Sequence, residues 1–291
     1  MNIKMNPMKR LIPILTLLIC FACGNPTQTN EKAIITVTIE PLRYFTEAIA
    51  GENYQVVSMV PKGSSPESYD PTPQQLVYLD KSQAYFRIGY IGFEQVWMKK
   101  LEANCPDMKV YNTSKGIDLI RDKGHWHGDH FHEGGVEPHI WNSTQNALII
   151  ADNIYQALCE LDSTHQEDYK NRLDSLKQSI QQTDAETRRL LVNADSTFLI
   201  YHPALSYFAR DYGLKQISIE EGGKEPSPAQ LKALIETCRN ENVHTIFVQQ
   251  EFDQRNAQLI ANELGVNIVS INPLSYDWVK EMIRIAEALK H

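Results

Sequence analysis

Residues 163–191 read STHQEDYKNRLDSLKQSIQQTDAETRRLL, and the fold is decided by this stretch and by what lies on either side of it. Ser163 to Gln166 have the pattern of a capping box that begins a helix. The apolar positions that follow are few among polar residues: Tyr169, Leu173, Leu176, Ile180 and Leu190. A long, mostly polar helix between two apolar segments is typical of a solvated strut that joins two domains. Such a strut would permit little hinge closure.

Short apolar runs rich in β-branched residues alternate with helical patterns on both sides of this helix. Expected strands cover residues 34–39, 54–60, 84–88 and 108–111 before it, and 197–201, 216–219, 245–248 and 267–271 after it. Expected helices cover 43–50, 73–81, 93–104 and, after a Ser143 or Thr144 cap, 147–161; in the second half they cover 204–211, 227–242 and 254–264. Alternating strands and helices form parallel sheets.

The sequence therefore predicts an α/β fold with two four-stranded parallel-sheet lobes. The N-terminal lobe would cover residues 34–163 and the C-terminal lobe residues 193–291, and one long rigid helix at 164–192 would join them. In open α/β sheets, ligands bind beyond the carboxyl ends of the strands. The expected site is thus a cleft between the two lobes.

The composition narrows the classes of partner. The chain has 291 residues, of which 42% are hydrophobic and 22% charged, which is typical of a globular protein and not of a disordered or multi-span membrane chain. The formal net charge is -8. Nucleic acids need a basic face, so the acidic balance argues against them and favours a cation as the ligand.

The N-terminus indicates export. Lys4, Lys9 and Arg10 precede an apolar run at 11–21 that suits a secretory signal and is too short for a membrane span. Residues 20–24, Cys-Phe-Ala-Cys-Gly, look like a loose bacterial lipoprotein cleavage box in which Cys23 would be lipidated. Residues 1–23 would then be signal and lipobox, and 24–33 a polar tether. The alternative is an ordinary cleaved signal.

The mature protein would be a lipoprotein anchored in a membrane and facing the periplasm or the cell exterior. Loss of residues 1–22 removes three basic and no acidic residues, which leaves 25 basic against 36 acidic residues and a net charge of -11. The remaining cysteines, Cys105, Cys159 and Cys238, are odd in number and widely spaced, so they indicate neither a disulfide framework nor a cysteine zinc site.

A histidine cluster lies in residues 121–136. Its four histidines, His125, His127, His130 and His132, fall in a glycine-broken stretch without helical or strand periodicity, which predicts a surface loop. Imidazole is a common ligand of zinc, copper and nickel, so this loop could collect metal ions. The alternative is a solvated polar loop without a role.

The string His125-x-His127-x-Asp129-His130 also matches the metal-binding string of metallo-β-lactamase-fold hydrolases. In that fold the string follows a buried strand, whereas residues 119–123 here, Leu-Ile-Arg-Asp-Lys, make a poor one. Both flanking regions also read as βα lobes. A zinc-dependent hydrolase is therefore the weaker alternative.

A second set of candidates comes from polar residues that follow the expected strands. Glu67, His202, Glu251 and Asp277 each lie beyond a strand end, and His139 follows the histidine loop. Carboxylates and imidazoles offered by both lobes would form one metal site in the cleft.

At these positions the sequence resembles the metal-receptor family of ABC importers, the zinc and manganese solute-binding lipoproteins called cluster A-I. The similar segments are residues 60–73 with Glu67, residues 137–141 with His139, residues 201–214 with His202, residues 225–228, residues 246–248 and residues 276–278 with Asp277. They run in family order over almost all of the mature chain. The resemblance implies two four-stranded lobes joined by one long helix, a membrane permease as partner and, in zinc-specific members, a histidine-rich loop before the second ligand.

One departure from the family affects the expected site. The family's first ligand is a histidine, and this sequence has Glu67 at that position. The expected ligands are thus Glu67, His139, His202 and Asp277, with Glu251 as an alternative ligand or as an acceptor that orients a histidine. Glu67 could instead be a gate residue while water fills the position, or a loop histidine could complete the site.

The function that follows is the capture of Zn(II) and its delivery to an ABC importer permease by a monomer, without catalysis. Two carboxylates would also suit manganese or iron, so a manganese receptor of the same fold is the second choice. An adhesin or structural lipoprotein is a third class, which a test of metal binding would separate from the other two.

Overall fold

The computed structural model describes residues 32–121, 125–127, 130–132, 135–220, 223–252 and 254–290. The predicted signal sequence, Cys23 and residues 24–31 of the tether lie outside these ranges, as do all side chains of residues 122–134. Residues from Lys32 onward form one compact unit. The predicted division into lobes at 163 and 193 stays a prediction, although each half has its own sheet. In the described part of the chain no helix is long and apolar enough to cross a membrane.

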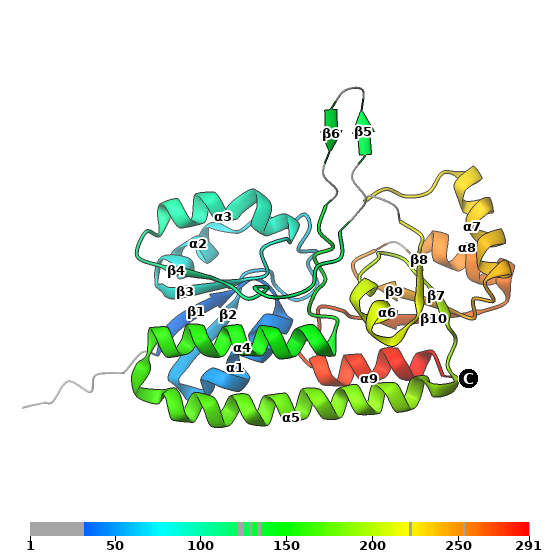
Figure 1. Ribbon diagram of the computed structural model, residues 1–291. Coiled ribbons are helices and arrows are strands. Elements are labelled where there is room, and N and C mark those ends of the chain that lie inside the picture. The colour runs from blue at the N-terminus through cyan, green and yellow to red at the C-terminus, as the bar shows by residue number, and fades with distance from the viewer. Residues whose placement is uncertain are drawn as a thin grey trace, which may run out of the picture. The chain divides into compact units, whose positions relative to one another are not determined.

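The first sheet is parallel and has the strand order β2-β1-β3-β4 (Figure 1). Its elements are β1 (Ala33–Val37), α1 (Glu40–Ala50), β2 (Tyr54–Ser58), α2 (Pro73–Asp80), β3 (Ser82–Arg87), α3 (Gly92–Asn104) and β4 (Lys109–Asn112). The central strands are buried on both faces, as Val37, Tyr85 and Phe86 have no exposed surface. Their near-continuous apolar runs suit a sheet that helices cover on both sides.

The second sheet is also parallel, with the order β10-β9-β7-β8. Its elements are β7 (Thr197–Ile200), α6 (Ser206–Tyr212), β8 (Lys215–Ser218), α7 (Pro228–Asn240), β9 (Thr245–Gln249), α8 (Arg255–Leu264), β10 (Asn267–Ile271) and α9 (Trp278–Ala288). When the strands of each half are numbered from one to four along the chain, both sheets have the order 2-1-3-4. The direction in which successive strands are added to the sheet therefore reverses between the first and the third strand. Ligand sites form at such reversals. The α/β fold with two four-stranded parallel sheets is confirmed.

Two helices join the halves, α4 (Thr144–Leu161) and α5 (Gln166–Leu190). Ser143 caps α4, because its hydroxyl accepts the Asn146 N–H at 3.0 Å. The predicted capping box at 163–166 is wrong: a 3-10 turn, Ser163–His165, precedes α5, and the Asp162 side chain caps that turn. Asp162 satisfies the free N–H of Thr164 first, so the helix begins later than the motif suggested.

The long helix α5 is more than a solvated strut. Its buried positions repeat at alternating spacings of four and three along the whole helix: Tyr169, Leu173, Leu176, Ile180, Thr183, Thr187 and Leu190. This stripe packs against α1, α4 and α9, so the helix is in contact with both halves (Figure 1). Thr183 and Thr187 fill two positions of this buried stripe, which the larger apolar residues alone do not make continuous.

The histidine loop contains a short antiparallel hairpin, so the prediction of a loop without strand periodicity is wrong. β5 (His125–His127) pairs with β6 (His130–His132), and the register places His125 opposite His132 and His127 opposite His130. An isolated bridge between Arg121 and Val136 lies at the base of the hairpin. The alternation His-Trp-His and His-Phe-His carries the period of two, but three residues are too few to stand out among glycines.

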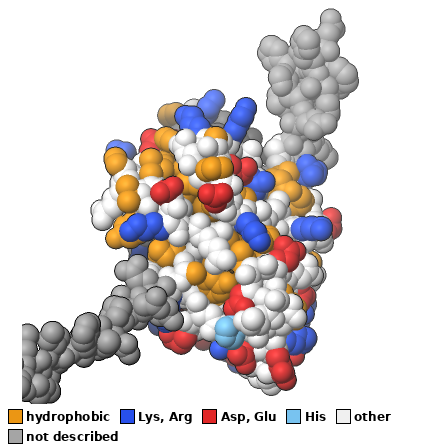
Figure 2. Space-filling model, turned by 90° about the vertical axis from the view of Figure 1, so that its left-hand side faces the viewer, with side chains coloured by type: hydrophobic (Ala, Val, Ile, Leu, Met, Phe, Trp, Pro, Cys, Tyr) orange, Lys and Arg blue, Asp and Glu red, His pale blue; other side chains and the backbone are white. Residues whose placement is uncertain are grey.

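Figure 2 shows the end of the molecule formed by the first half of the chain. Acidic and basic side chains occur together across this face, with hydrophobic side chains between them. The net negative charge of the chain is therefore not concentrated on this face.

Candidate metal centre

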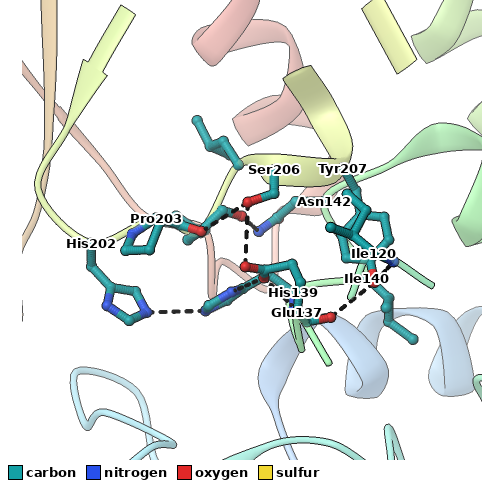
Figure 3. A network of polar contacts seen from close by, with 12 residues as sticks. Ile120, Glu137, His139, Ile140, Asn142, His202, Pro203, Ser206 and Tyr207 are labelled. Carbon is teal, nitrogen blue, oxygen red and sulfur yellow. Dashed lines mark hydrogen bonds and ion pairs between the residues drawn. The ribbon is translucent and has the colours of Figure 1, made fainter. Parts of the chain in front are cut away.

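Two histidines from different halves of the chain meet beside the second sheet. His202 follows the carboxyl end of β7, and His139 lies in the segment between the Arg121–Val136 bridge and α4. Their Nε2 atoms face each other at 3.3 Å (Figure 3). Both rings are largely buried, with 8% and 18% of the side chain exposed for His139 and His202. The structure thus brings together two of the predicted ligands.

In each imidazole, the nitrogen that faces away from the other ring, Nδ1, is in contact with a carboxylate. Glu137 Oε1 is hydrogen-bonded to His139 Nδ1, and Glu220 Oε2 is 3.1 Å from His202 Nδ1. Neither role was predicted from the sequence. Glu220 lies directly beyond the end of the expected strand at 216–219, so the rule that found His202 could also have found it. Glu137 lies two residues before His139, within the segment that carries the family resemblance.

The surroundings shift the pKa values of His202 and Glu137. Burial lowers the pKa of His202, and His139 lowers it further, whereas Glu220 and Glu67 act in the opposite direction. Burial alone would raise the pKa of Glu137, but its hydrogen bonds and electrostatic interaction with His139, together with the Ser206 hydroxyl, hold that pKa below its usual range. A neutral imidazole beside an ionised carboxylate is the state in which histidine binds a metal.

Aromatic rings and an amide fix the imidazoles further. Phe252 stacks on His202 with the ring centroids 5.0 Å apart, and Trp141 meets His139 edge-on at 5.2 Å. Gln249, at the end of β9, donates to the His202 carbonyl at 2.7 Å and accepts its N–H at 3.3 Å. Both imidazole rings are therefore held in orientation, and Gln249 also holds the backbone of His202.

The two imidazoles line a small cavity of about 30 Å³. Its other polar lining residues include Glu67 and Glu251, and its apolar lining includes Trp141 and Phe252. The Glu67 carboxylate accepts the N–H of Gly92 at the start of α3, at 3.2 Å. A cavity of this volume has room for one ion and about one or two waters.

Asp277 does not line this cavity. It is the N-cap residue of α9, and the preceding residue, Tyr276, turns toward α1, where its hydroxyl is hydrogen-bonded to Glu47. Among the described residues, no three His, Cys, Asp or Glu side chains lie close enough together to hold one ion. The structure therefore presents the histidine pair, with the carboxylates of Glu67 and Glu251 at the cavity wall.

Two tryptophans join the segments that carry the site. Trp141 Nε1 donates to the Pro273 carbonyl at 2.8 Å, and Trp278 Nε1 donates to the Trp141 carbonyl at 2.8 Å. Both side chains are buried. The loop after β10 is thus fixed to the segment that bears His139.

The comparisons with known proteins agree with this architecture. A family model described as "Zinc-uptake complex component A periplasmic" matches residues 35–291. The chain belongs to the ZnuA family. A crystal structure of ZnuA superposes with a TM-score of 0.81 at 34% identity, over 88% of this chain and 97% of that one. A deletion mutant of ZnuA with zinc bound matches equally, at 34% identity and a TM-score of 0.81, over 89% of this chain and 99% of that one.

Two curated relatives carry different metals in their names. The zinc-binding lipoprotein AdcA of Streptococcus pneumoniae is 26% identical over 93% of this chain, which spans only 56% of the length of AdcA. The iron ABC transporter substrate-binding lipoprotein MtsA of Streptococcus pyogenes is also 26% identical, over 89% of this chain and 85% of its own length. Identity alone does not separate the metals.

Members of the ZnuA family are metal-binding substrate-binding proteins of ABC importers and not enzymes. The hydrolase alternative is therefore wrong. Its string begins and ends in the β5–β6 hairpin, an antiparallel ribbon outside both parallel sheets, and not at the end of a buried strand.

Proposed function

We propose that this ZnuA-family protein captures Zn(II) outside the cytoplasm and delivers it to the permease of an ABC importer. The observation that carries the proposal is the pair of buried Nε2 atoms, 3.3 Å apart, whose rings are each held from behind by a carboxylate. A tetrahedral zinc with Zn–N bonds of about 2.0–2.1 Å places two imidazole ligands about 3.3–3.4 Å apart. The separation of the pair therefore suits two ligands of one zinc ion.

The remaining ligands of the proposed site are carboxylates of the cavity wall. Glu67 occupies the position where the family resemblance implies a histidine, and Glu251 lies on the opposite half of the chain, beyond β9. We propose Glu67 as the third ligand and Glu251 as the fourth ligand or as a partner of a bound water. Asp277 is left out of this set because it does not line the cavity.

Two properties of the cavity support zinc as the cargo. Imidazole suits zinc better than it suits manganese, and the two best-placed groups are imidazoles. The volume of about 30 Å³ excludes a metal bound to an organic chelator. The carboxylates favour manganese or iron in comparison with an all-histidine site, so manganese is the competitor that a test must include.

The test is native mass spectrometry of metal-free protein offered equal zinc and manganese. We expect one tightly bound zinc per chain, and loss of that zinc when His139 and His202 are both replaced by alanine. His165→Ala, which replaces a histidine that does not line the cavity, is the matched control and should bind as the wild type does. Retention of manganese with rejection of zinc would overturn the choice of metal, and tight one-to-one binding by the double variant would overturn the site.

The histidines of the β5–β6 hairpin form a second, weaker binding element in this proposal. His125, His127, His130 and His132 would collect metal near the cleft. Replacing all four with alanine should remove weakly bound equivalents of zinc and leave one tightly bound ion. Loss of the tight ion in that variant would place a hairpin histidine in the main site.

Export and anchoring complete the proposal. AdcA and MtsA are both named as lipoproteins, which supports lipidation of Cys23 after removal of the preceding residues. Metabolic labelling with a fatty acid should mark the wild type and not Cys23→Ala, whereas release of the wild type as an unlabelled soluble protein would indicate ordinary signal cleavage. The partner would be a membrane permease, and the receptor would act as a monomer.

A further inference from the structure

We propose that Glu137 and Glu220 are positioning residues that hold both site imidazoles in the Nδ1–H tautomer, so that both Nε2 lone pairs are directed at the cargo ion. The inference rests on the proposed function, since it assigns roles within the same site. It adds two residues that the ligand set does not contain. It also makes the metal affinity of the site depend on two carboxylates that do not coordinate the ion.

The tautomer follows from the hydrogen bonds of Glu137. Its Oε1 accepts the backbone N–H of His139 at 3.0 Å and is also bonded to the ring Nδ1 of the same residue. Its Oε2 accepts the hydroxyl of Ser206 at 3.3 Å. A carboxylate that serves three donors acts only as an acceptor, so the proton of the neutral ring must sit on Nδ1. The Nε2 atom then carries the free lone pair.

His202 has a similar carboxylate contact at its Nδ1. Its Nδ1 is 3.1 Å from Glu220 Oε2, and both side chains are largely buried, with 18% and 10% exposed for His202 and Glu220. The two Nε2 atoms are 3.3 Å apart, a distance at which one could donate to the other in a different tautomer. With both Nδ1 atoms donating, neither Nε2 carries a hydrogen, and the two lone pairs face each other. Such an arrangement is repulsive when empty, and a cation between the rings relieves the repulsion.

Glu137 is the stronger of the two anchors because the opposite half of the chain holds it. Ser206, which donates to Glu137, itself accepts the side-chain N–H of Gln216 in β8 at 3.0 Å. Gln216 also accepts the Leu205 N–H at 2.8 Å. The Tyr207 hydroxyl donates to the Glu137 carbonyl at 2.9 Å (Figure 3). The orientation of His139 is thus set by α6 and β8.

Nitrogen NMR of metal-free protein with labelled histidine reads the tautomer directly. In the wild type we expect both site histidines to show protonated Nδ1 and unprotonated Nε2. Glu137→Ala removes the acceptor, so His139 should populate the Nε2–H tautomer, and the zinc affinity should fall about 10- to 100-fold. Glu137→Gln keeps an acceptor oxygen for Nδ1 and should recover most of the tautomer and part of the affinity.

The controls separate positioning from folding and from the proposed function. Glu236→Ala on α7, a carboxylate paired with Arg239 outside the cavity, should change neither the tautomer nor the affinity. If Glu137→Ala does not fold, Glu220→Ala gives the same test through the His202 signals. An unchanged tautomer in both alanine variants, or an Nε2–H tautomer in the wild type, overturns this inference. Because the tautomer is read without metal, that result is distinct from a failure of zinc binding.

Discussion

The carboxylate of Glu67 is bonded to the backbone N–H of Gly92 at 3.2 Å, and no residue larger than glycine fits at position 92. A Cβ there would lie 2.6 Å from the Glu67 carbonyl oxygen and 2.7 Å from its Oε2. The next N–H of α3, that of Phe93, donates to the Pro66 carbonyl at 2.9 Å. The segment that carries Glu67 is therefore docked on the first turn of α3, where the helix dipole favours a negative group.

Gly92→Ala should weaken zinc binding by displacing Glu67 from the cavity wall. We expect a loss of about tenfold, equal to about 1.4 kcal/mol, measured by competition with a chelator. In a Glu67→Ala background the same substitution should have little further effect, because the two residues act together. An undiminished effect of Gly92→Ala in that background would show that position 92 acts by another route.

Glu67→His should strengthen the preference of the site for zinc over manganese. The substitution would add a third imidazole, and imidazole favours zinc over manganese. Because the Glu67 residue is exposed, the fold should tolerate the change. Competition between the two ions, measured in the wild type and the variant, gives the ratio of affinities. An unchanged ratio would mean that Glu67 does not reach the ion.

Trp141→Phe should destabilise the protein by about 1–3 kcal/mol. The Trp141 side chain is fully buried, and its loss would leave the Pro273 carbonyl without its 2.8 Å hydrogen bond. Urea unfolding measures the change. Trp97→Phe is the matched control, since its indole N–H contacts the exposed Asp70 carboxylate, and a surface change of this kind costs less than about 0.5 kcal/mol. Equal effects of the two substitutions would contradict the role of Trp141.

The stability of the first half should carry a pH-dependent contribution from Glu94. Burial raises the pKa of Glu94 above the ordinary 4.5, although the Thr38 hydroxyl and the N–H groups of Ile88 and Gly89 act in the opposite direction. A carboxyl that binds its proton more tightly in the folded state contributes most below its unfolded pKa. That contribution is lost as the pH rises through the folded pKa.

This prediction is tested by urea unfolding of the wild type and Glu94→Gln at several pH values above 4.5. The free energy of unfolding of the wild type minus that of the variant should fall as the pH rises, by at most about 1.4 kcal/mol per pH unit. Glu94→Ala should give the same pH dependence, because neither variant titrates at this position. A difference that grows with pH would show that the hydrogen bonds outweigh burial.

The elements of the fold were largely predictable because apolar periodicity reports burial directly. All eight strands of the two parallel sheets were expected, with ends that differ by at most two residues. The helix α9 was not expected, although Trp278, Met282 and Ile285 form its buried side. The α5 stripe was only partly recognised, since Thr183 and Thr187 are polar residues that the helix buries.

The strand-end rule was reliable only for residues that lie close to the end of their strand, whereas Glu67 and His139 were expected from the family resemblance as well. His202 comes within two residues of the end of β7, so the direction of the strand places it. Asp277 is separated from β10 by residues 272–276, and over that distance the chain turns toward Glu47 on α1. The roles of Glu137 and Glu220 depend on which ring nitrogen they meet, which only the packing of the two halves determines.

The volume of the cavity has a consequence for how an ion enters it. With about 30 Å³ available, a cation cannot keep its complete shell of water inside the cavity and must shed most of it to bind. Magnesium loses water reluctantly and prefers to keep several waters. We therefore expect dehydration to discriminate against magnesium, so that part of the selectivity lies in the small volume of the cavity and not in the chemistry of the histidines.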